Sequence, residues 1–297
     1  QINVRGPDTD QGPDEGLTAG SLSVQQGGTA LAYVAVNLKS CLFDAASHRL
    51  AVPVAKLSSC DGVIKSSDGR EISYWELTDD VSDAKVGEWL PSWADLETSD
   101  YRPERRSEID AVVRGDAHFL HDLVWPDMLH ARVVRPRNIL SHLVTLDVDV
   151  ITVLPGVIHV EVNGDFIGVI AEQEDQAVNA ALEIQKVAIW EAFQQTDDAG
   201  VDPQDYIGAP AESEWVTAEP NGELLEQSWT RSALYSRPFI AHASIGPSCA
   251  VAIYDERLTV WSHSQGVYLL RKEIARVLEM SESNVRVIHS PGAGAYG

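Results

Sequence analysis

The stretch "LTVWSHSQGVYLLRKEIARVLEMSESNVRVIHSPGAGAYG", residues 258–297, holds a strand, a helix and a second strand, and it decides the fold. The apolar alternation around its start predicts a hairpin that turns at Asp255 and Glu256. Apolar residues at helical spacing then predict a helix over residues 267–281. The second strand leads into a loop of small residues that begins at Gly292. Both strands therefore end in small or amide side chains.

The two strand ends are candidates for a single ligand-binding site. Ligands bind at the carboxyl edge of a sheet, where neighbouring strand ends converge. Gln265 follows the first strand and offers a side-chain amide, and the glycine loop exposes backbone N–H groups without bulky side chains. The alternative is a pair of tight turns with no ligand, and the spacing alone does not separate the two interpretations.

The N-terminal third is predicted to contain a polar loop, a helix and a linker. In residues 1–28, Ile2 and Val4 predict the start of a strand, and a long polar loop follows it. A helix is predicted over residues 26–48, where leucines and valines form an apolar face among alanines. The polar, proline-containing stretch 78–106 is the best candidate for a linker.

The middle of the chain is predicted to be strands with one helix. Strand patterns begin at about Ile109, and the acidic pair in "LDVDVI", residues 146–151, is interpreted as the solvated face of a strand. Residues 174–193 lack glycine and proline and are predicted to be helical. A second polar linker is predicted at residues 195–222. This mixture predicts an α+β or α/β unit.

The histidines are weak candidates for metal ligands. His118 and His121 have a spacing that suits a metal, but in a strand their side chains point to opposite faces, which argues against a shared metal ion. His242, His263 and His289 lie beside the two strand ends, where a histidine either lines a pocket or is structural. No G-x-S-x-G stretch is present to suggest a hydrolase.

The chain is strongly acidic, with 22 Lys and Arg against 45 Asp and Glu and a net charge of −23. Such a field repels phosphate backbones, which excludes nucleic acid and anionic membrane surfaces as partners. No apolar run approaches the roughly 20 residues of a membrane span. Three cysteines, Cys41, Cys60 and Cys249, show no C-x-x-C spacing, so neither a disulfide framework nor a thiolate metal site is expected.

The final stretch resembles the xanthine dehydrogenase and aldehyde oxidase family. In that family a strand ending in T-Q-G is followed by a helix and a G-G-G-F-G loop. This chain has Ser264-Gln265-Gly266 at the first motif and residues 292–297 at the second. Upstream, "RPFIAHASIGPSCAVA", residues 237–252, is similar to the family's H-x-x-L-E-P stretch, with Gly246 where many members carry Glu.

Two further segments carry the same resemblance. Residues 112–137 and 154–181 are similar to the opening and the closing parts of the family's hammerhead domain. Residues 4–31, "VRGPDTDQGPDEGLTAGSLSVQQGGTAL", resemble its cofactor segment G-D-T-x-x-x-P-x-x-x-x-T-A-[GA]-S-x-[ST]. This segment lies before the hammerhead, and in this order the chain resembles the bacterial branch that includes isoquinoline 1-oxidoreductase and nicotinate dehydrogenase-like large subunits.

The resemblance implies an α+β fold in which partial molybdenum-cofactor-binding domains flank an a/b hammerhead domain. The implied boundaries are residues 1–105 for the first part with its linker, 106–200 for the hammerhead and 201–297 for an incomplete second part. The implied cofactor is molybdopterin with molybdenum, in its cytosine dinucleotide form, held without a direct metal ligand from the protein.

The resemblance also implies the residues of the site. Gln265 would donate a hydrogen bond to an oxygen ligand of the molybdenum, and the small loop would bring backbone donors close to the cofactor. The implied cofactor-binding residues are Thr18, Gly20, Ser21, Ser23, Gln265, Gly266, Gly292, Gly294, Ala295, Tyr296 and Gly297. His242 and Gly246 would line the substrate pocket.

The implied reaction is hydroxylation of an aldehyde or an N-heteroaromatic carbon with oxygen from water. The family's base, a Glu in a G-x-G-E stretch, does not occur in the sequence, so we expect a fragment that is inactive alone and needs the rest of the large subunit. Electrons would leave through a separate iron–sulfur subunit, because three cysteines cannot hold clusters. The alternative is a non-catalytic acidic scaffold or binding protein with the hammerhead fold. Nothing in the sequence assigns a cellular compartment.

Overall fold

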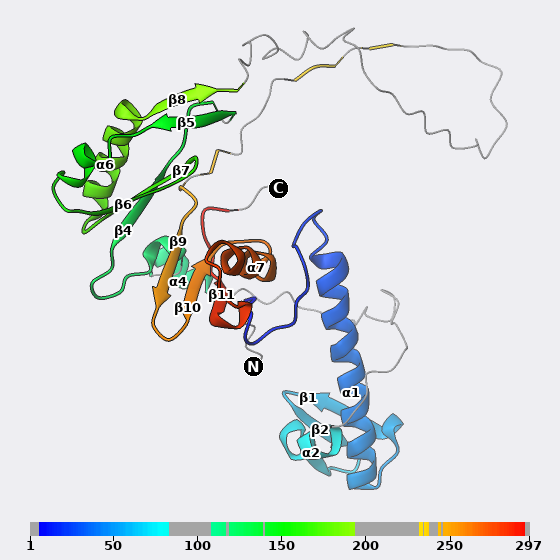
Figure 1. Ribbon diagram of the computed structural model, residues 1–297. Coiled ribbons are helices and arrows are strands. Elements are labelled where there is room, and N and C mark those ends of the chain that lie inside the picture. The colour runs from blue at the N-terminus through cyan, green and yellow to red at the C-terminus, as the bar shows by residue number, and fades with distance from the viewer. Residues whose placement is uncertain are drawn as a thin grey trace. The chain divides into compact units, whose positions relative to one another are not determined.

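The structure is a computed structural model (Figure 1), and the contacts within its chain divide it into two compact units. One unit comprises residues 1–123 and 244–297, and the other comprises residues 124–243. The structure describes residues 6–82, 108–116, 119–138, 140–193, 232–233, 235–237, 243–244 and 246–294. Because most of both predicted linkers lies outside these residues, the domain boundaries stay a prediction.

The first unit contains the three-stranded sheet that the opening stretch predicts (Figure 1). The strands β9 (Ala250–Tyr254) and β10 (Leu258–Ser262) form the antiparallel hairpin, and β11 (Val285–His289) pairs with β10 in parallel. The helix α7 (Val267–Val277) connects the two parallel strands. Apolar side chains from the strands and the helix form one core, whose buried members are Leu258, Val260, Val267, Ala275, Val285 and Val287.

The chain's N-terminal segment adds a short edge to this sheet. The Thr9 N–H donates to the Val287 carbonyl at 3.1 Å, and the His289 N–H donates to the Pro7 carbonyl at 2.8 Å. Asp8 forms an antiparallel bridge with Ile288. The expected strand entry at Ile2 and Val4 lies outside the described residues. Residues predicted as a polar loop are therefore held along β11 by backbone hydrogen bonds.

The first unit also carries the long helix α1 (Thr29–Leu50), which confirms the helix predicted over residues 26–48. A π-helical turn, Val24–Gly28, precedes it. The second half of α1 packs on a small antiparallel sheet of β1 (Leu57–Cys60), β2 (Val63–Ser66) and β3 (Glu71–Ser73), with α2 (Thr78–Val81) beside it. The buried core of this region is Leu42, Ala46, Ile64 and Leu77.

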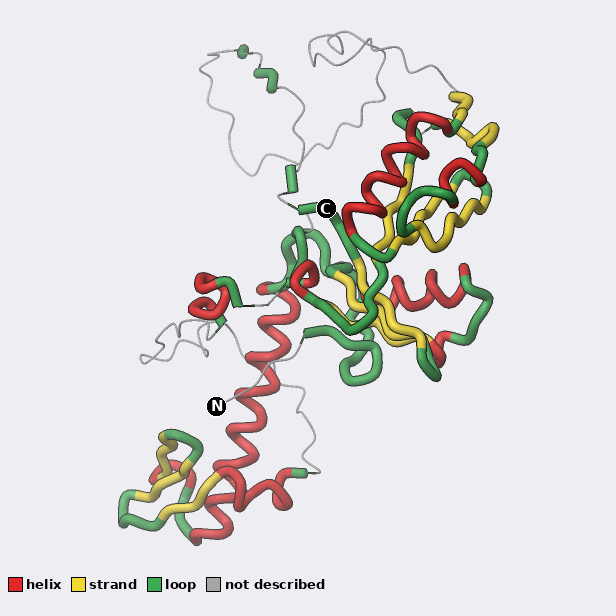
Figure 2. The backbone as a smooth tube through the Cα atoms, turned by 90° about the vertical axis from the view of Figure 1, so that its left-hand side faces the viewer, coloured by secondary structure: helices red, strands yellow, loops and turns green. Residues whose placement is uncertain are grey.

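The second unit packs one helix on an antiparallel sheet (Figure 2). Its sheet runs in the order β4 (His130–Val134), β7 (Phe166–Ala171), β6 (Val157–Asn163). The helix α6 (Glu174–Val187) contributes Ala180 and Ile184 to a core shared with the strands. A separate pair joins β5 (Ser141–Thr145) to β8 (Ile189–Ala192). The mixture of helix and sheet confirms the predicted α+β character.

Three secondary-structure predictions are wrong. The first is the strand at Ile109, which is instead the helix α4 (Ile109–Arg114). Its apolar residues Ile109, Val112 and Val113 fit helical spacing equally well. Gly115 then ends the helix in the left-handed conformation, with φ of 79°, and Asp110 and Arg114 suit the helix dipole at its two ends.

The other two errors lie in the second unit. The "LDVDVI" pair is exposed as predicted, but it lies at the start of the short helix α5 (Asp149–Thr152) and not in a strand. The Asp147 carboxylate accepts the Asp149 N–H at 3.1 Å, in a local turn that precedes the helix. The helix predicted over residues 174–193 ends at Val187. The chain after it becomes the strand β8, because pairing with β5 favours an extended backbone there.

Candidate functional site

The carboxyl ends of β10 and β11 lie side by side, as the sequence predicts for a ligand-binding edge. The parallel register pairs Ser262 with His289, the last residue of each strand. Beyond them, the Ser290 N–H donates to the Ser262 carbonyl at 3.0 Å, and both serines are buried. The loops that follow the two strands therefore begin side by side at one edge of the sheet.

Thr18 and Gln265 meet through two hydrogen bonds, although they lie far apart in the sequence. The Thr18 N–H donates to the Gln265 carbonyl at 2.9 Å, and the Gln265 side-chain amide donates to the Thr18 carbonyl at 2.6 Å. Gly266 follows immediately, and a Cβ built on it would lie 3.2 Å from Leu17. The structure thus brings two of the predicted cofactor-binding sequences into contact.

The turn after Thr18 has a backbone that most residues avoid. Gly20 has φ of 65° and Ser21 has φ of 57°, so two successive residues are left-handed. Turn conformations of this kind can aim N–H groups into an anion-binding concavity. Ser23 then starts the π-helical turn, and its carbonyl accepts the Gly28 N–H at 2.8 Å. Uncommon backbone geometry of this type is found at functional sites.

A cluster of ion pairs fixes the segment that leads to this turn. Arg286 on β11 donates two hydrogen bonds to the Asp8 carboxylate, at 3.0 and 2.6 Å. Arg257 donates to Asp10 at 2.9 Å. The hydrogen bonds from Arg286 hold the pKa of Asp8 below its usual value of 3.8, and they raise the pKa of Arg286.

Sequence reasoning did not find this cluster. The signal was present in the charged residues of "GPDTDQG", residues 6–12, and in Arg286 within an otherwise apolar strand. The partners are brought together only by the fold. The Tyr268 hydroxyl adds a further tie, because it donates to the Gly12 carbonyl.

The glycine loop is close to a histidine side chain. A Cβ built on Gly292 would lie 2.7 Å from the Cβ of His263, so that no larger residue fits without a shift. Within the described part of the chain, the buried Nδ1 of His263 has no hydrogen-bond partner. Gly294 has φ of 101°. The predicted site residues Ala295, Tyr296 and Gly297 lie outside the described residues.

Of the two predicted substrate-pocket residues, the structure describes only one. His242 lies outside the described residues, whereas Gly246 lies beside the glycine loop. A Cβ on Gly246 would be 3.3 Å from His121 Nε2 and 3.9 Å from the Cβ of Ala293. His121 was predicted as part of a strand, and it is instead in the 3₁₀ turn Leu120–Asp122, so the prediction of its strand geometry is wrong.

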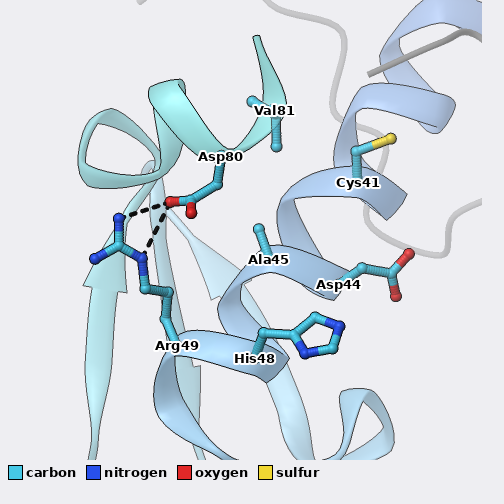
Figure 3. Close-up of a pocket in the computed structure, with 7 residues that line it drawn as sticks. All are labelled: Cys41, Asp44, Ala45, His48, Arg49, Asp80 and Val81. Carbon is cyan, nitrogen blue, oxygen red and sulfur yellow. Dashed lines mark hydrogen bonds and ion pairs between the residues drawn. The ribbon is translucent and has the colours of Figure 1, made fainter. Parts of the chain in front are cut away.

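A surface hollow of about 570 Å³ lies elsewhere in the first unit, between α1 and α2 (Figure 3). Cys41, Asp44 and His48 line it, and an ion pair between Arg49 and Asp80 closes one side. No group of three or more metal-ligating side chains occurs among the described residues, here or elsewhere. The helices of the described ranges include none that is long and apolar enough to cross a membrane.

Comparisons with known proteins match a family model and a curated relative. Residues 219–297 match the family model of the molybdopterin cofactor-binding domain. The chain is 32% identical over 314 residues to one of the subunits of nicotinate dehydrogenase from Pseudomonas putida, a match that covers 100% of this chain and 26% of that protein. The chain thus spans about a quarter of the length of this curated relative.

Two solved structures are also similar to part of the chain. One is quinoline 2-oxidoreductase from Pseudomonas putida 86, with a TM-score of 0.45 and 19% identity over 65% of this chain and 30% of that chain. The other is the reconstituted CO dehydrogenase from Oligotropha carboxidovorans, with a TM-score of 0.42 and 14% identity over 65% of this chain and 31% of that chain. The motifs, the domain match and the curated relative thus support a place for the chain among the molybdopterin-binding large subunits of the xanthine dehydrogenase and aldehyde oxidase family.

Proposed function

We propose that the chain is the cofactor-binding portion of the large subunit of a molybdenum hydroxylase. The observation that carries the proposal is the pair of hydrogen bonds between Thr18 and Gln265, at 2.9 and 2.6 Å. They join the predicted cofactor segment to the carboxyl edge of a parallel strand pair, which is where α/β sheets bind ligands. The cofactor is molybdopterin in its cytosine dinucleotide form.

The described residues fit such a cofactor. An amide NH₂ group carries two donor hydrogens, so Gln265 can bind the Thr18 carbonyl with one and a cofactor oxygen with the other. The left-handed turn at Gly20 and Ser21 suits an anion, which the acidic chain repels elsewhere. The buried Nδ1 of His263 is a polar atom in need of a partner at the same edge.

The chemistry at this edge divides between the cofactor and the protein. When bound, molybdopterin supplies the redox centre for hydroxylation of an aldehyde or N-heteroaromatic carbon with oxygen from water. Gln265 positions the cofactor through its amide, and Gly292 keeps the loop close to β10. The remaining cofactor contacts at Ala295, Tyr296 and Gly297, and substrate contacts at His242 and Gly246, belong to the same proposal.

The complete enzyme needs further parts. Three cysteines, none in a cluster-binding pattern, leave the iron–sulfur clusters to a separate electron-transfer subunit. The chain spans about a quarter of its curated relative, and the proposal places the catalytic base in a part of the large subunit that this chain does not span. In this arrangement residues 106–200 form the hammerhead domain between two parts of the cofactor-binding domain.

Isotope labelling tests the proposed reaction. The complete large subunit, co-expressed with its iron–sulfur subunit, is incubated in ¹⁸O-water with nicotinate and an artificial electron acceptor. The proposal predicts one ¹⁸O atom in each hydroxylated product. A free-standing protein with no pterin would support the alternative of a non-catalytic scaffold.

A further inference from the structure

The 3₁₀ turn Leu120–Asp122 contacts two loops that are far apart in the sequence. The Leu120 N–H donates to the Pro291 carbonyl at 2.6 Å, and the side chain of Leu120 is only 1% exposed. The neighbouring His121 places Nε2 at 2.8 Å from the Pro247 carbonyl. Two successive residues thus tie one loop to the other.

Both loops carry residues of the proposed site. Gly246 immediately precedes Pro247, and Gly292 immediately follows Pro291. The His121 imidazole lies 3.3 Å from the position of a Cβ on Gly246. A methyl group there would therefore press against the nitrogen that holds the loop, and the ring occupies space that a larger side chain at residue 246 would need.

The partner of His121 defines its tautomer. A carbonyl oxygen only accepts hydrogen bonds, so the proton of the neutral ring must be on Nε2. A glutamine at this position can place its amide N–H near the same carbonyl, whereas a leucine of similar size cannot donate. The two substitutions therefore separate the hydrogen bond from the volume of the side chain.

We propose that His121 is a positioning residue, which holds the Gly246 turn against the glycine loop and limits the size of substrate that fits beside Gly246. This inference rests on the proposed function, because that function makes Gly246 part of the substrate pocket. His121 acts through the Pro247 carbonyl, at 2.8 Å, and through the space that its ring fills.

The test compares His121→Leu, His121→Gln and Gly246→Ala in the complete large subunit, in complex with its iron–sulfur subunit. The control is His159→Leu, since His159 is an exposed histidine that is also hydrogen-bonded, to Glu161 at 3.0 Å. Hydrogen exchange at residues 246–249, molybdenum content, and kcat and KM for a small aldehyde and a two-ring N-heterocycle are measured for each.

Loss of one hydrogen bond in His121→Leu should speed exchange at the amides of residues 246, 248 and 249 by about fivefold to tenfold. It should lower KM for the two-ring substrate by a similar factor, because the released turn no longer limits the space beside Gly246. The kcat and the molybdenum content should change less than about twofold. His121→Gln should restore slow exchange, and Gly246→Ala should raise KM for the larger substrate more than for the aldehyde. His159→Leu should change none of these.

Unchanged exchange at residues 246–249 in His121→Leu would overturn the inference, as would equal acceleration throughout the chain. An unchanged KM ratio between the two substrates in both His121→Leu and Gly246→Ala would overturn the size limit. If the wild-type protein holds no molybdenum, the proposed function fails, and the exchange measurement still decides whether His121 positions the loop.

Discussion

Gly292 shows how a single contact determines a residue. The sequence argument assigned the small residues of the glycine loop to close approach by a cofactor, and the structure adds an intramolecular reason. Because a Cβ on Gly292 would lie 2.7 Å from the Cβ of His263, the loop can run beside β10 only when residue 292 has no side chain.

Gly292→Ala should therefore lower the free energy of unfolding by about 1–3 kcal/mol, as overpacking does in a filled site. Urea unfolding of the protein measures this change. Gly27→Ala is the matched control, because a Cβ on Gly27 meets nothing within 4 Å and its φ is not in the left-handed range. Equal stability of Gly292→Ala and the wild type would show that the loop does not need this contact.

The ion pair of Asp8 with Arg286 gives a prediction on mutation. The side chains are only 10% and 28% exposed, so removing one charge leaves the other poorly solvated. Asp8→Asn should lower the free energy of unfolding by roughly 1.5–3 kcal/mol. Asp80→Asn, which breaks the more exposed pair with Arg49, should have a much smaller effect. Similar losses in the two variants would contradict the account.

The same pair predicts a dependence on pH. The pKa of Asp8 in the folded chain is below its usual 3.8 because Arg286 hydrogen-bonds to the carboxylate. Above pH 3.8 the ionised Asp8 makes its full contribution to the free energy of unfolding. This contribution is lost as the pH falls from 3.8 through the lowered pKa of the folded state. In acid-unfolding measurements, the free energy of unfolding of Asp8→Asn should lack the part of the pH dependence that comes from protonation of Asp8. Parallel curves for the variant and the wild type in this range would rule out the assignment.

At the scale of elements, local sequence predicted most of the first unit's sheet and missed its edge. Alternation and turn residues were sufficient for β9, β10, α7 and β11, because each pattern is local. The segment Pro7–Thr9 has no strand pattern, and only tertiary hydrogen bonds to β11 make it extended. The same reason explains β8, whose pairing with β5 ended the predicted helix at Val187.

The Thr9 hydroxyl tests whether this edge is held as described. It accepts the Val287 N–H at 3.0 Å in a buried position. Thr9→Val keeps the shape of the side chain and leaves this N–H without its acceptor, which should cost about 1–3 kcal/mol and speed amide exchange at Val287. The control is Thr152→Val, an exposed residue of α5. Unchanged exchange at Val287 would contradict the edge pairing.

At the scale of the whole molecule, the motifs in the sequence predicted the family, and the strand pattern predicted two strand ends that meet at one edge of a sheet. The resemblance implied a cofactor contact for both Gln265 and Thr18, whereas the two hydrogen bonds between them were not predicted. The Asp8 and His121 contacts could not be predicted, because each joins residues that only the tertiary fold brings together. Spacing within a sequence carries no information on such pairs.

Molybdenum and pterin content of the complete large subunit, purified with its iron–sulfur subunit, tests the central claim most directly. The account predicts about one molybdenum and one pterin per large subunit, measured by inductively coupled plasma mass spectrometry and by the fluorescence of the oxidised pterin. Gln265→Leu should reduce both, because the variant loses the amide donor at the strand end. A folded wild-type complex with neither molybdenum nor pterin would contradict the account.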